Sequence, residues 1–442
     1  MRYVIIGGVA AGMSAAMQIV RNKEDPEIIT LESGGFYSYA QCGLPYIIGG
    51  EVEDTNHLIA RDVQTFRDKY GIDARVYHHV TEVDTKQQIV KGEDLERQQS
   101  FEISYDKLLI ASGGSPVLPD WPGHHLHGVH TLKTIPHVQH ILNDLNHAQD
   151  ITIVGGGYIG LELAENLIES GHRVRLIERN NRLAKMFDED MTPLVHDEAA
   201  KHDVELCLNE SVVEINGDKR VESVTTDKNH YQTDMVIAAT GIKPNTDFLK
   251  HTGIHKYDNG AIIVNPYMET NIENVYAAGD CATQFHRIKQ KDDYVPLGTH
   301  ANKQGRVAGQ NLAGEAKAFQ GIVGTSILRF FDLTLAKTGL SEKEAAALNF
   351  PYEIVLHQGS DIAGYFHDKK PLHMKMMYRT DTNVVIGGQV IGESGADKRI
   401  DVLATAIFHQ MTVSDFEDLD LSYAPPYNGV WDPLQQTARR AK

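Results

Sequence analysis

Apolar and polar positions alternate in blocks along the first two thirds of the chain. An apolar run at residues 3–6 ends in two glycines, a helical pattern covers residues 13–22, and a second apolar run covers residues 27–31. Similar apolar runs return at residues 151–154 and 174–177, again on either side of a glycine-rich turn and a helical stretch. Strands that alternate with amphipathic helices in this way are typical of βαβ units with a parallel sheet.

The glycine-rich turn after the first run indicates a dinucleotide site. It has the spacing Gly7-x-x-x-x-Gly12, with Val9 where the middle glycine of G-x-G-x-x-G would stand. Glu32 follows the second run, twenty residues after Gly12, where a carboxylate can bind a ribose hydroxyl. A tight turn before a buried helix is the alternative, and Val9 keeps it open. The residues expected at this site are Gly7, Gly8, Val9, Ala10, Ala11, Gly12 and Glu32.

The second turn carries the complete motif. Gly155-Gly156-Gly157-Tyr158-Ile159-Gly160 follows a strand and precedes a helix, and Glu178 ends the next strand. Two such units about 148 residues apart imply two Rossmann-like domains that bind two dinucleotides. Glu178 favours the free ribose of NADH, whereas Arg179 and Arg182 could hold the 2′-phosphate of NADPH. Both nicotinamide cofactors therefore stay open.

Three further apolar strands end in small residues. Those over residues 105–114 and 233–241 are interpreted as crossings between domains, with a buried strand and turn as the alternative for each. The third ends at Gly279-Asp280, where the aspartate can accept a hydrogen bond from a polyol hydroxyl or cap a helix N-terminus.

The last part of the chain has a different pattern. From about residue 325, predicted strands over 326–331 and 372–378 and helices over 342–348 and 399–410 carry no glycine motif. We expect a third domain here, for self-association. The predicted fold class is α/β, with two Rossmann-like domains and a C-terminal α+β domain.

Length, charge and histidine spacing narrow the class of protein. The 442 residues predict two to four domains, and the formal net charge of −18 argues against non-specific binding of nucleic acid or an anionic membrane. The N-terminus runs straight into a strand and no apolar run reaches the ~18 residues of a membrane span, so we expect a cytoplasmic protein. The 22 histidines show no metal-ligand spacing, and no metal site is expected.

One cysteine stands apart in the segment Ser38–Tyr46. Cys42 has no second cysteine within five residues, so it cannot form an internal disulfide with a near neighbour. We interpret Cys42 as a redox thiol beside a flavin, with its pKa lowered by a helix N-terminus that follows it. Ser38, one helical turn earlier, either binds the thiolate or the ligand or caps a helix. Cys207 and Cys281 are expected in the core.

These motifs together resemble a known family. The two glycine turns, Ser38-x-x-x-Cys42-x-x-x-Tyr46, Gly279-Asp280 and the segments 395–400 and 423–427 are similar to those of the pyridine nucleotide–disulfide oxidoreductases, in their single-cysteine branch. The resemblance extends over essentially the whole chain. The domains that it implies are an FAD-binding domain of residues 1–112 and 246–324, an NAD(P)H-binding domain of residues 113–245 and a dimerisation domain of residues 325–442.

The resemblance also implies an activity. NADH or NADPH would reduce FAD, which would pass two electrons to a mixed disulfide between Cys42 and coenzyme A, so that coenzyme A disulfide is reduced to two thiols. Tyr365 and Tyr423 would reach the thiol from the partner subunit of a homodimer, where a phenol can protonate the departing thiolate. Tyr158 would gate the flavin face.

Contacts with the cofactors and with coenzyme A follow from the same resemblance. Beyond the two turns and their acidic residues, cofactor contacts are implied for Val80, Ser112, Gly113, Glu162, Gly241, Gly279, Asp280 and Ala301. Substrate contacts are implied for Ser14, Gln18, Arg21, Ser38, Gln41, Arg61, Lys69, Asn302, Arg306, Tyr427 and Trp431.

Other activities fit the same thiol. Water-forming NADH oxidases and NADH peroxidases resemble this chain but use a histidine in the first glycine turn, and Ala10 stands there in this sequence. Loss of such a base would remove a contribution of roughly 10²–10⁴ to the rate, so we favour the disulfide reductase. Reduction of polysulfide through a Cys42 persulfide is a further alternative, and a flavoprotein that hands electrons to a protein partner is a third.

Overall fold

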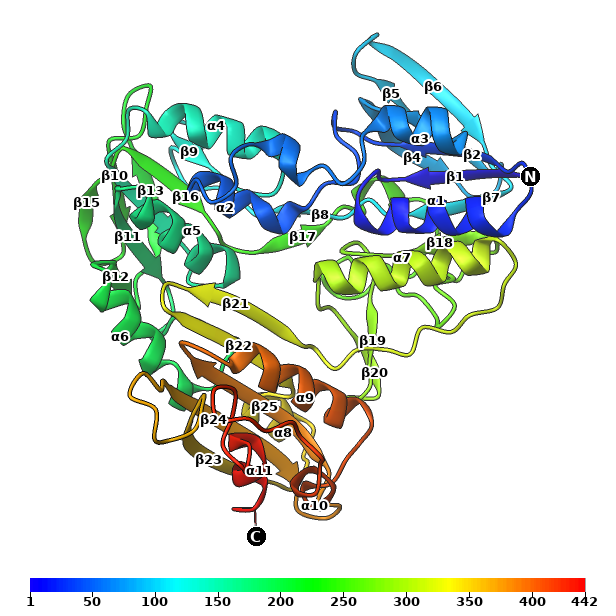
Figure 1. Cartoon of the computed structure of the whole chain (residues 1–442). Coiled ribbons are helices and arrows are strands. Elements are labelled where there is room, and N and C mark those ends of the chain that lie inside the picture. Colours follow the sequence, from blue (N-terminus) through cyan, green and yellow to red (C-terminus); the bar gives the residue numbers. More distant parts are fainter. Residues whose placement is uncertain (442) are drawn as a thin grey trace.

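The computed structural model describes residues 1–441 and consists of three lobes, two at the top of Figure 1 and a C-terminal one below them. Two parallel sheets and one antiparallel sheet, each of five strands, form the centres of these lobes. This arrangement confirms the predicted class, in which two α/β domains are joined to a C-terminal α+β domain. Within residues 1–441, no helix combines the length and the apolar character that a membrane crossing requires. Lys442, the last residue of the predicted dimerisation domain, lies outside the described residues.

The first lobe is built on the parallel sheet β18–β7–β1–β2–β3. Its strands are β1 Arg2–Ile6, β2 Glu27–Leu31, β3 Asp73–Arg75, β7 Lys107–Ile110 and β18 Val275–Ala277. β1 pairs with β7 on one side and β2 on the other and is buried beyond its first residue, so its sequence is a continuous apolar run. The chain leaves this sheet after β7 and returns only at β18, so the first lobe is discontinuous in sequence.

Two long helices of this lobe, α1 (Ala10–Asn22) and α7 (Gly298–Leu312), lie side by side in Figure 1. A β-carbon built on Gly305 would lie 2.2 Å from the Ala11 carbonyl oxygen, and one on Gly309 would lie 2.4 Å from that of Ala15. Only glycine therefore permits this close approach. The remaining helices of these chain segments are η1 Gln41–Gly43, α2 Leu44–Ile48, η2 Thr55–Leu58, α3 Val63–Tyr70 and η4 Asp247–Leu249. Of these, α2 packs into the core of the second lobe (Figure 1).

The second lobe repeats the arrangement around the parallel sheet β12–β11–β10–β16–β9. Its strands are β9 Val129–His130, β10 Asp150–Val154, β11 Arg173–Glu178, β12 Glu205–Leu208 and β16 Met235–Ala238, and its helices are α4 Ile135–Leu145, α5 Tyr158–Glu169, η3 Glu189–Met191 and α6 Pro193–Lys201. The antiparallel ribbon of β8 (Gly114–Pro116) and β17 (Ile242–Pro244) joins the two lobes where the sequence pattern placed domain crossings.

Smaller sheets complete the upper lobes. They contain β4 His78–Asp84, β5 Ile89–Asp94 and β6 Gln99–Ser104; β13 Val212–Asn216, β14 Ser223–Thr226 and β15 His230–Gln232; and β19 Gln284–His286 with β20 Lys291–Asp293.

The C-terminal lobe is an antiparallel sheet in the order β21–β22–β25–β24–β23. Its elements are β21 Ser326–Phe330, β22 Leu333–Gly339, α8 Glu342–Ala347, β23 Tyr352–Ser360, β24 Pro371–Arg379, β25 Val385–Gly392, α9 Ala396–Phe408, α10 Val413–Glu417 and α11 Pro433–Ala438. All residues of β25 are buried. Helix α9 covers one face of the sheet, with Ile400 and Leu403 in the shared core. The helix predicted over 399–410 begins three residues earlier, directly after Gly395.

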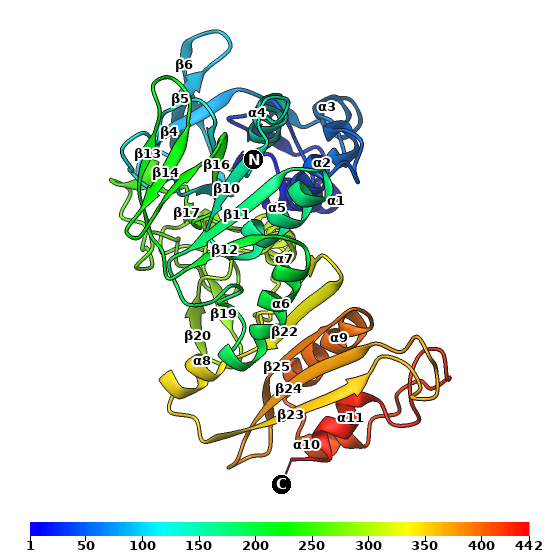
Figure 2. The ribbon, with the colours of Figure 1, turned by 90° about the vertical axis from the view of Figure 1, so that its left-hand side faces the viewer.

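Buried charges fix the C-terminal lobe to the second lobe. The C-terminal lobe lies below the second lobe in Figures 1 and 2. Lys375 of β24 is 2% exposed, and its ammonium lies 3.2 Å from an Asp188 carboxylate oxygen and 2.7 Å from one of Asp190. Glu342 of α8 also pairs with it. The Gln389 side chain accepts a hydrogen bond from the Asp188 N–H and donates one to its carboxylate. These contacts hold the segment after β11 in place.

Candidate active site at the meeting of the lobes

The first glycine turn has the geometry of an anion-binding helix start. Gly7 has φ +110°, and a β-carbon there would lie 2.1 Å from the Ala111 carbonyl oxygen. A β-carbon on Gly12 would lie 1.9 Å from the Gly7 oxygen, so both glycines are required sterically. Val9 has φ −109°, which any L-residue can adopt, and this explains why valine is tolerated where the motif has glycine. No side chain caps α1, which leaves its first N–H groups available to a phosphate.

Glu32 closes this site at the end of β2. Its carboxylate accepts hydrogen bonds from the N–H groups of Gly8 and Gly34, each at 2.8 Å. The turn and the acid are therefore held together before any ligand enters. A half-buried carboxylate beside an uncapped helix start fits the ribose and pyrophosphate of a dinucleotide.

The second turn reproduces the same geometry. Gly155 has φ +115° and packs against Ala239, and a β-carbon on Gly160 would lie 1.9 Å from the Gly155 oxygen. Gly157, which precedes α5, faces open space, and no side chain caps this helix. The Glu178 carboxylate accepts a hydrogen bond from the Gly156 N–H at 2.8 Å. This turn also fits a dinucleotide.

The two arginines after Glu178 differ in their surroundings. Arg182 lies 3.4 Å from the Glu189 carboxylate, whereas Arg179 is exposed. Glu178 itself is only 6% exposed and is held by the backbone of Gly156 and Asn180. A buried carboxylate at this place favours a cofactor with a free ribose hydroxyl over one with a 2′-phosphate.

Cys42 lies beside the start of helix α7. It is the only exposed cysteine among the described residues, since Cys207 and Cys281 are buried as predicted. It lies on the 3₁₀ turn η1, directly before α2. A β-carbon built on Gly298 would lie 3.9 Å from the Cys42 Sγ, so the thiol faces the start of α7, a helix of fifteen residues without a side-chain cap.

The expected lowering of the Cys42 pKa is wrong for this structure. Burial is the largest effect and raises the pKa of the thiol, and the negative charge of Glu162 raises it further. Lys133 acts in the opposite direction, but more weakly. The helix start that follows Cys42 belongs to a five-residue helix and does not outweigh these effects.

Glu162 and Lys133 are the charged groups with the largest effects on the pKa of Cys42. Burial and the neighbouring Glu165 raise the pKa of Glu162 to about 7, so this carboxyl group changes its charge near neutral pH. The Lys133 ammonium lies 2.9 Å from the Asp280 carboxylate. The sequence did not single out Lys133, because a lone lysine after a short strand has no spacing that distinguishes it.

Two of the open alternatives in the sequence are now decided. No helix begins after Asp280, whose carboxylate pairs with Lys133, so its interpretation as a helix cap is wrong. Ser38 has φ +44° and the helical turn begins only at Gln41, so Ser38 neither caps a helix nor lies one helical turn before Cys42. The Ser38 N–H donates to the Gly8 carbonyl oxygen at 2.9 Å, which ties the cysteine segment to the first glycine turn.

Two of the predicted substrate residues, Ser14 on α1 and Asn302 on α7, are in direct contact. The Ser14 hydroxyl donates to the Asn302 side-chain oxygen at 2.9 Å, and the Asn302 amide donates to the Gly298 carbonyl oxygen at 3.0 Å. Successive contacts therefore connect Cys42 through Gly298 and Asn302 to Ser14. Arg306 is exposed one turn further along α7, and Arg21 is exposed at the end of α1. Gln18, by contrast, is buried between these helices.

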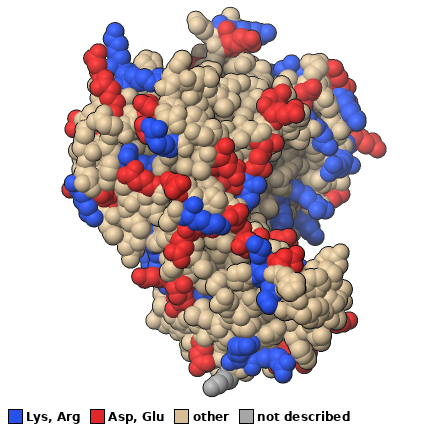
Figure 3. Space-filling view, turned by 60° about the vertical axis from the view of Figure 1, so that its left-hand side comes forward, with Lys and Arg blue, Asp and Glu red and all other residues tan. Residues whose placement is uncertain are grey.

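Arg61 and Lys69 lie around one aromatic ring. The Arg61 guanidinium lies 5.6 Å and the Lys69 ammonium 5.5 Å from the centre of the Tyr70 ring. Figure 3 shows Lys and Arg side chains gathered in and beside a hollow on one face of the molecule, despite the net charge of −18. Local basic groups of this kind are what an anionic ligand needs on an acidic protein.

The other predicted cofactor residues occupy the ends of strands and the start of α7. The Ser112 hydroxyl donates to the Asn245 carbonyl oxygen at 2.6 Å, and Gly113 and Gly241 flank this crossing with positive φ. Val80 and Ala301 are buried, and Gly279, with φ +86°, packs on Ala301. The Gln41 amide donates to the Tyr39 hydroxyl at 3.3 Å, at the start of η1.

Tyr158 and Ile159 stand at the start of α5. Ile159 is 37% exposed, whereas the Tyr158 hydroxyl forms a hydrogen bond with the Ser326 hydroxyl at the start of β21. The predicted gate is thus held by a residue of the C-terminal lobe, a contact that the sequence did not suggest.

The predicted partner-subunit residues Tyr365 and Tyr423 and the predicted substrate residues Tyr427 and Trp431 all lie in the C-terminal lobe. Tyr365, Tyr423, Tyr427 and Trp431 are 69%, 49%, 71% and 46% exposed. Loss of hydration raises the pKa of Tyr365, and hydrogen bonding with Tyr423 raises it further, so the two phenols lie together. Both views show α11, which follows the tyrosine segment, low in the C-terminal lobe, and α2, which follows Cys42, in the upper part of the molecule (Figures 1 and 2). Within one subunit these tyrosines and Cys42 are not brought together.

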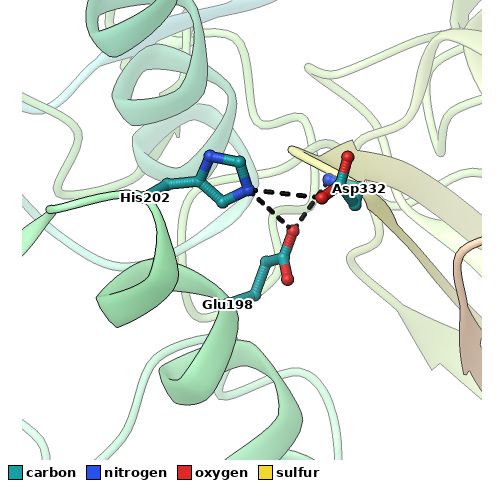
Figure 4. A group of neighbouring side chains, drawn as sticks. All are labelled: Glu198, His202 and Asp332. Carbon is teal, nitrogen blue, oxygen red and sulfur yellow. Dashed lines mark hydrogen bonds and ion pairs between the residues drawn. The ribbon is translucent and has the colours of Figure 1, made fainter.

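A cluster of Glu198, His202 and Asp332 links α6 to the turn between β21 and β22 (Figure 4). The His202 Nε2 lies 3.2 Å from a Glu198 oxygen and 3.5 Å from an Asp332 oxygen. The Lys201 ammonium pairs with both carboxylates, and the Asp332 N–H donates to Glu198 at 2.8 Å. These contacts, and the stacking of His202 on Phe331, explain the cluster as an ionic contact between lobes.

Family models match this chain in two blocks. The model of the pyridine nucleotide–disulphide oxidoreductases matches residues 1–305, and that of their dimerisation domain matches residues 325–433. The chain belongs to the pyridine nucleotide–disulphide oxidoreductase family. It is an oxidoreductase, and FAD and NAD(P)H are the cofactors that the family implies for its two glycine turns.

Several similar proteins carry names for related activities. The NAD(P)H sulfur oxidoreductase (CoA-dependent) of Pyrococcus abyssi is 39% identical over 99% of this chain and 98% of its own length. The coenzyme A disulfide reductase of Staphylococcus aureus is 33% identical over the full length of both chains. The structure of the water-forming NADH oxidase of Lactobacillus brevis, bound to NADH, matches with a TM-score of 0.96 at 30% identity, over 100% of this chain and 98% of that one.

Proposed function

We propose that this protein reduces coenzyme A disulfide to two molecules of coenzyme A with NAD(P)H, through a mixed disulfide on Cys42. The observation that carries the proposal is a single exposed cysteine that has no cysteine partner and faces the start of α7, from which polar contacts continue to Asn302 and Ser14. A dithiol enzyme would need a second thiol within reach. A lone thiol must instead form its disulfide with a ligand.

The step at sulfur follows from the thiol and its neighbours. The Cys42 thiolate attacks one sulfur of coenzyme A disulfide, the S–S bond breaks, and one coenzyme A leaves as a thiolate. Two electrons then cleave the mixed disulfide to the Cys42 thiolate and a second coenzyme A thiolate. Bound FAD, reduced by NAD(P)H, supplies those two electrons. Each coenzyme A thiolate takes up one proton, and the Tyr365 and Tyr423 phenols are the proposed donors for the first.

The proton donors belong to the second subunit in this proposal. In this proposal the exposed tyrosines of the C-terminal lobe act on the Cys42 of the partner in a homodimer and not on Cys42 of their own chain. Exposed aromatic residues are typical of interface positions. The predicted domain boundaries, at residues 112, 245 and 324, are part of the same proposal.

The polar and basic residues along α1 and α7 support a substrate that carries phosphates. Ser14, Asn302 and Arg306 extend from the thiol along α1 and α7, and Arg21 lies at the end of α1. Phosphates bind to such basic groups through charge-assisted hydrogen bonds. The first glycine turn contains Ala10 and no histidine, which disfavours the peroxide chemistry of the related oxidases.

A native protein sample tests the proposal directly. Mass spectrometry of the intact protein should show coenzyme A bound to Cys42 through a bond that a thiol reductant cleaves, and NADH consumption should depend on added coenzyme A disulfide. A sulfenic acid on Cys42 with rapid oxygen consumption would instead establish an oxidase. An unmodified thiol that reduces a protein acceptor rapidly would establish an electron-transfer protein.

Polysulfide reduction is a second candidate, because the relative from Pyrococcus abyssi is named as a CoA-dependent sulfur oxidoreductase. A Cys42 persulfide would then take the place of the mixed disulfide. Comparing kcat/KM for coenzyme A disulfide with that for polysulfide, with and without free coenzyme A, separates the two candidates.

A further inference from the structure

The largest fully buried side chain of the C-terminal lobe is an arginine. Arg399 of α9 is 2% exposed, and its Nε lies 3.2 Å from the carboxylate of Asp432, which is 1% exposed. Its Nη1 donates to the Gly395 carbonyl oxygen at 3.2 Å. Its Nη2 donates to the Asp361 carbonyl oxygen at 3.0 Å and to the Asn428 side-chain oxygen at 3.2 Å. The guanidinium therefore holds three separate segments of the chain at one point.

Two of those segments carry the exposed tyrosines. Asp361 begins the loop between β23 and β24, which contains Tyr365. Asn428 and Asp432 lie directly after Tyr423–Tyr427, before α11. The loops also meet directly, since the Ala363 N–H donates to the Pro425 carbonyl oxygen at 3.1 Å. Arg399 lies beneath this meeting point and bonds to both sides of it.

The guanidinium packs closely against Gly395, where a side chain would collide with it. Gly395 has φ +76°, and a β-carbon built on it would lie 2.1 Å from the Arg399 Nη1. The Asn428 amide donates to the Asp432 carboxylate at 2.6 Å, and the Asp361 carboxylate accepts the N–H groups of Ile362 and Lys370. Each polar group around the arginine is satisfied, as a buried charge requires.

We propose that Arg399 is a positioning residue for the reaction: its guanidinium ties together the Tyr365 loop and the Tyr423 loop and so sets the geometry that the two phenols present to the partner subunit. This inference rests on the proposed function, in which Tyr365 and Tyr423 act as proton donors. Guanidinium is suited to the task because its planar fork carries five donors in fixed directions. A lysine at this place could pair with Asp432 but could not bond to both loops.

The substitution Arg399→Lys tests the inference in the FAD-loaded dimer. Arg379→Lys is the matched control, because Arg379 forms an Arg–Asp pair with Asp381 at the opposite end of β24 from the Tyr365 loop. In Arg399→Lys, hydrogen–deuterium exchange should become faster in residues 361–370 and 420–432, and kcat for coenzyme A disulfide should fall roughly 100-fold, as expected for catalytic groups misplaced by about 1 Å. NADH-dependent reduction of ferricyanide, which needs no tyrosine, should stay unchanged. Asn428→Ala, which cuts only one of the ties, covers the case in which Arg399→Lys does not fold.

A double-mutant cycle separates positioning from general damage. Arg399→Lys added to Tyr365→Phe/Tyr423→Phe should cause no further loss of kcat, because the groups through which Arg399 acts are already gone. A further 100-fold loss, or unchanged exchange in both loops, would overturn the inference while the proposed function stands. If Tyr365→Phe/Tyr423→Phe keeps full activity but exchange in the loops still rises in Arg399→Lys, the tyrosine role in the proposed function fails and the positioning role falls with it.

Discussion

At the scale of single residues, the surroundings of Cys42 decide its chemistry. The thiol is exposed to a ligand, yet burial of its sulfur and the charge of Glu162 raise its pKa. Lys133, paired with Asp280 at 2.9 Å, is the neighbouring group that favours the thiolate. A thiol with a raised pKa is a slow nucleophile at neutral pH but a strong one once ionised. The charge state of Glu162 therefore regulates how much thiolate is present.

Replacement of Glu162 by glutamine should lower the pKa of Cys42. The wild-type carboxyl has a pKa of about 7, so above neutral pH it is charged and holds the thiol protonated. Without that charge, thiolate forms at lower pH, and the pH profile of iodoacetamide modification of Cys42 should move toward lower pH. Glu169→Gln, an exposed position on the same helix, should leave the profile in place. Identical profiles for wild type and Glu162→Gln would contradict this assignment.

Cys42 itself should be indispensable for disulfide reduction and dispensable for cofactor binding. Cys42→Ser removes the nucleophile and should lower kcat/KM for coenzyme A disulfide by at least ~10³-fold, since a serine hydroxyl cannot form the mixed disulfide. The yellow colour of bound FAD and its bleaching by NADH should persist, because the glycine turns are untouched. A serine variant that still reduces coenzyme A disulfide at the wild-type rate would rule out the proposed mechanism.

At the scale of elements, the pair α1 and α7 connects the cofactor turn with the thiol. α1 begins at the first glycine turn, α7 begins beside Cys42, and Gly305 and Gly309 let the two helices approach closely. Ser14 and Asn302 therefore meet at 2.9 Å on the surface of the pair. One helix pair thus serves both the dinucleotide and the proposed disulfide substrate.

Arg21 should contribute to binding of coenzyme A but not of small disulfides. Arg21→Ala should raise KM for coenzyme A disulfide roughly 3- to 10-fold, the range of a single exposed charge contact, and leave KM for cystine unchanged. Arg75→Ala is a suitable control, because Arg75 is a surface residue that pairs with Asp73. Equal effects on both substrates would exclude a phosphate contact.

At the scale of the whole molecule, the proposed active site requires two subunits. Figure 1 shows α11, which follows the tyrosine segment, low in the C-terminal lobe, and α2, which follows Cys42, in the upper part of the molecule, and the family includes a dimerisation domain that matches residues 325–433. The C-terminal lobe must therefore be held at a fixed orientation to the other lobes. Buried ionic contacts at Lys375 and at Glu198 provide that constraint.

Mixed dimers should restore activity from two inactive parents. One subunit carries Cys42→Ser, and the other carries Tyr365→Phe/Tyr423→Phe. If the tyrosines act on the partner's thiol, the mixed dimer contains one intact site and should show about half the wild-type kcat per dimer, because one of its two sites is complete. Two differently tagged chains, co-expressed and purified through both tags, provide the sample. A mixed dimer as inactive as its parents would place the tyrosines and the thiol in the same subunit.

Lys375 should be essential for the contact between the second and the C-terminal lobe. Lys375→Met leaves Asp188, Asp190 and Glu342 without their counter-charge, and breaking a buried pair of this kind costs about 3–5 kcal/mol. The urea midpoint, followed by release of FAD fluorescence, should fall clearly. Lys370→Met removes a surface pair with Glu393 and should leave the midpoint almost unchanged. A stable Lys375→Met protein would show that the buried charges do not hold the lobes together.

The sequence by itself determined the parts of this protein that depend on local geometry. Gly7, Gly12, Gly155 and Gly160 stand where a β-carbon would collide with backbone, so the two turns could be located from spacing alone. Apolar runs flanked by helices identified both parallel sheets, because strands buried on both faces leave a continuous signal. The lone cysteine was equally visible, since its isolation is a property of the chain.

Only the tertiary structure decided what surrounds these motifs. The pKa of Cys42, the pairing of Lys133 with Asp280, the conformation of Ser38 and the bond between Tyr158 and Ser326 all depend on segments thirty or more residues apart. Burial and charge depend on distances in space, which no periodicity encodes. For the same reason the sequence does not distinguish Arg399 from any other helix residue. Only the folded structure shows that Arg399 bonds to both tyrosine loops.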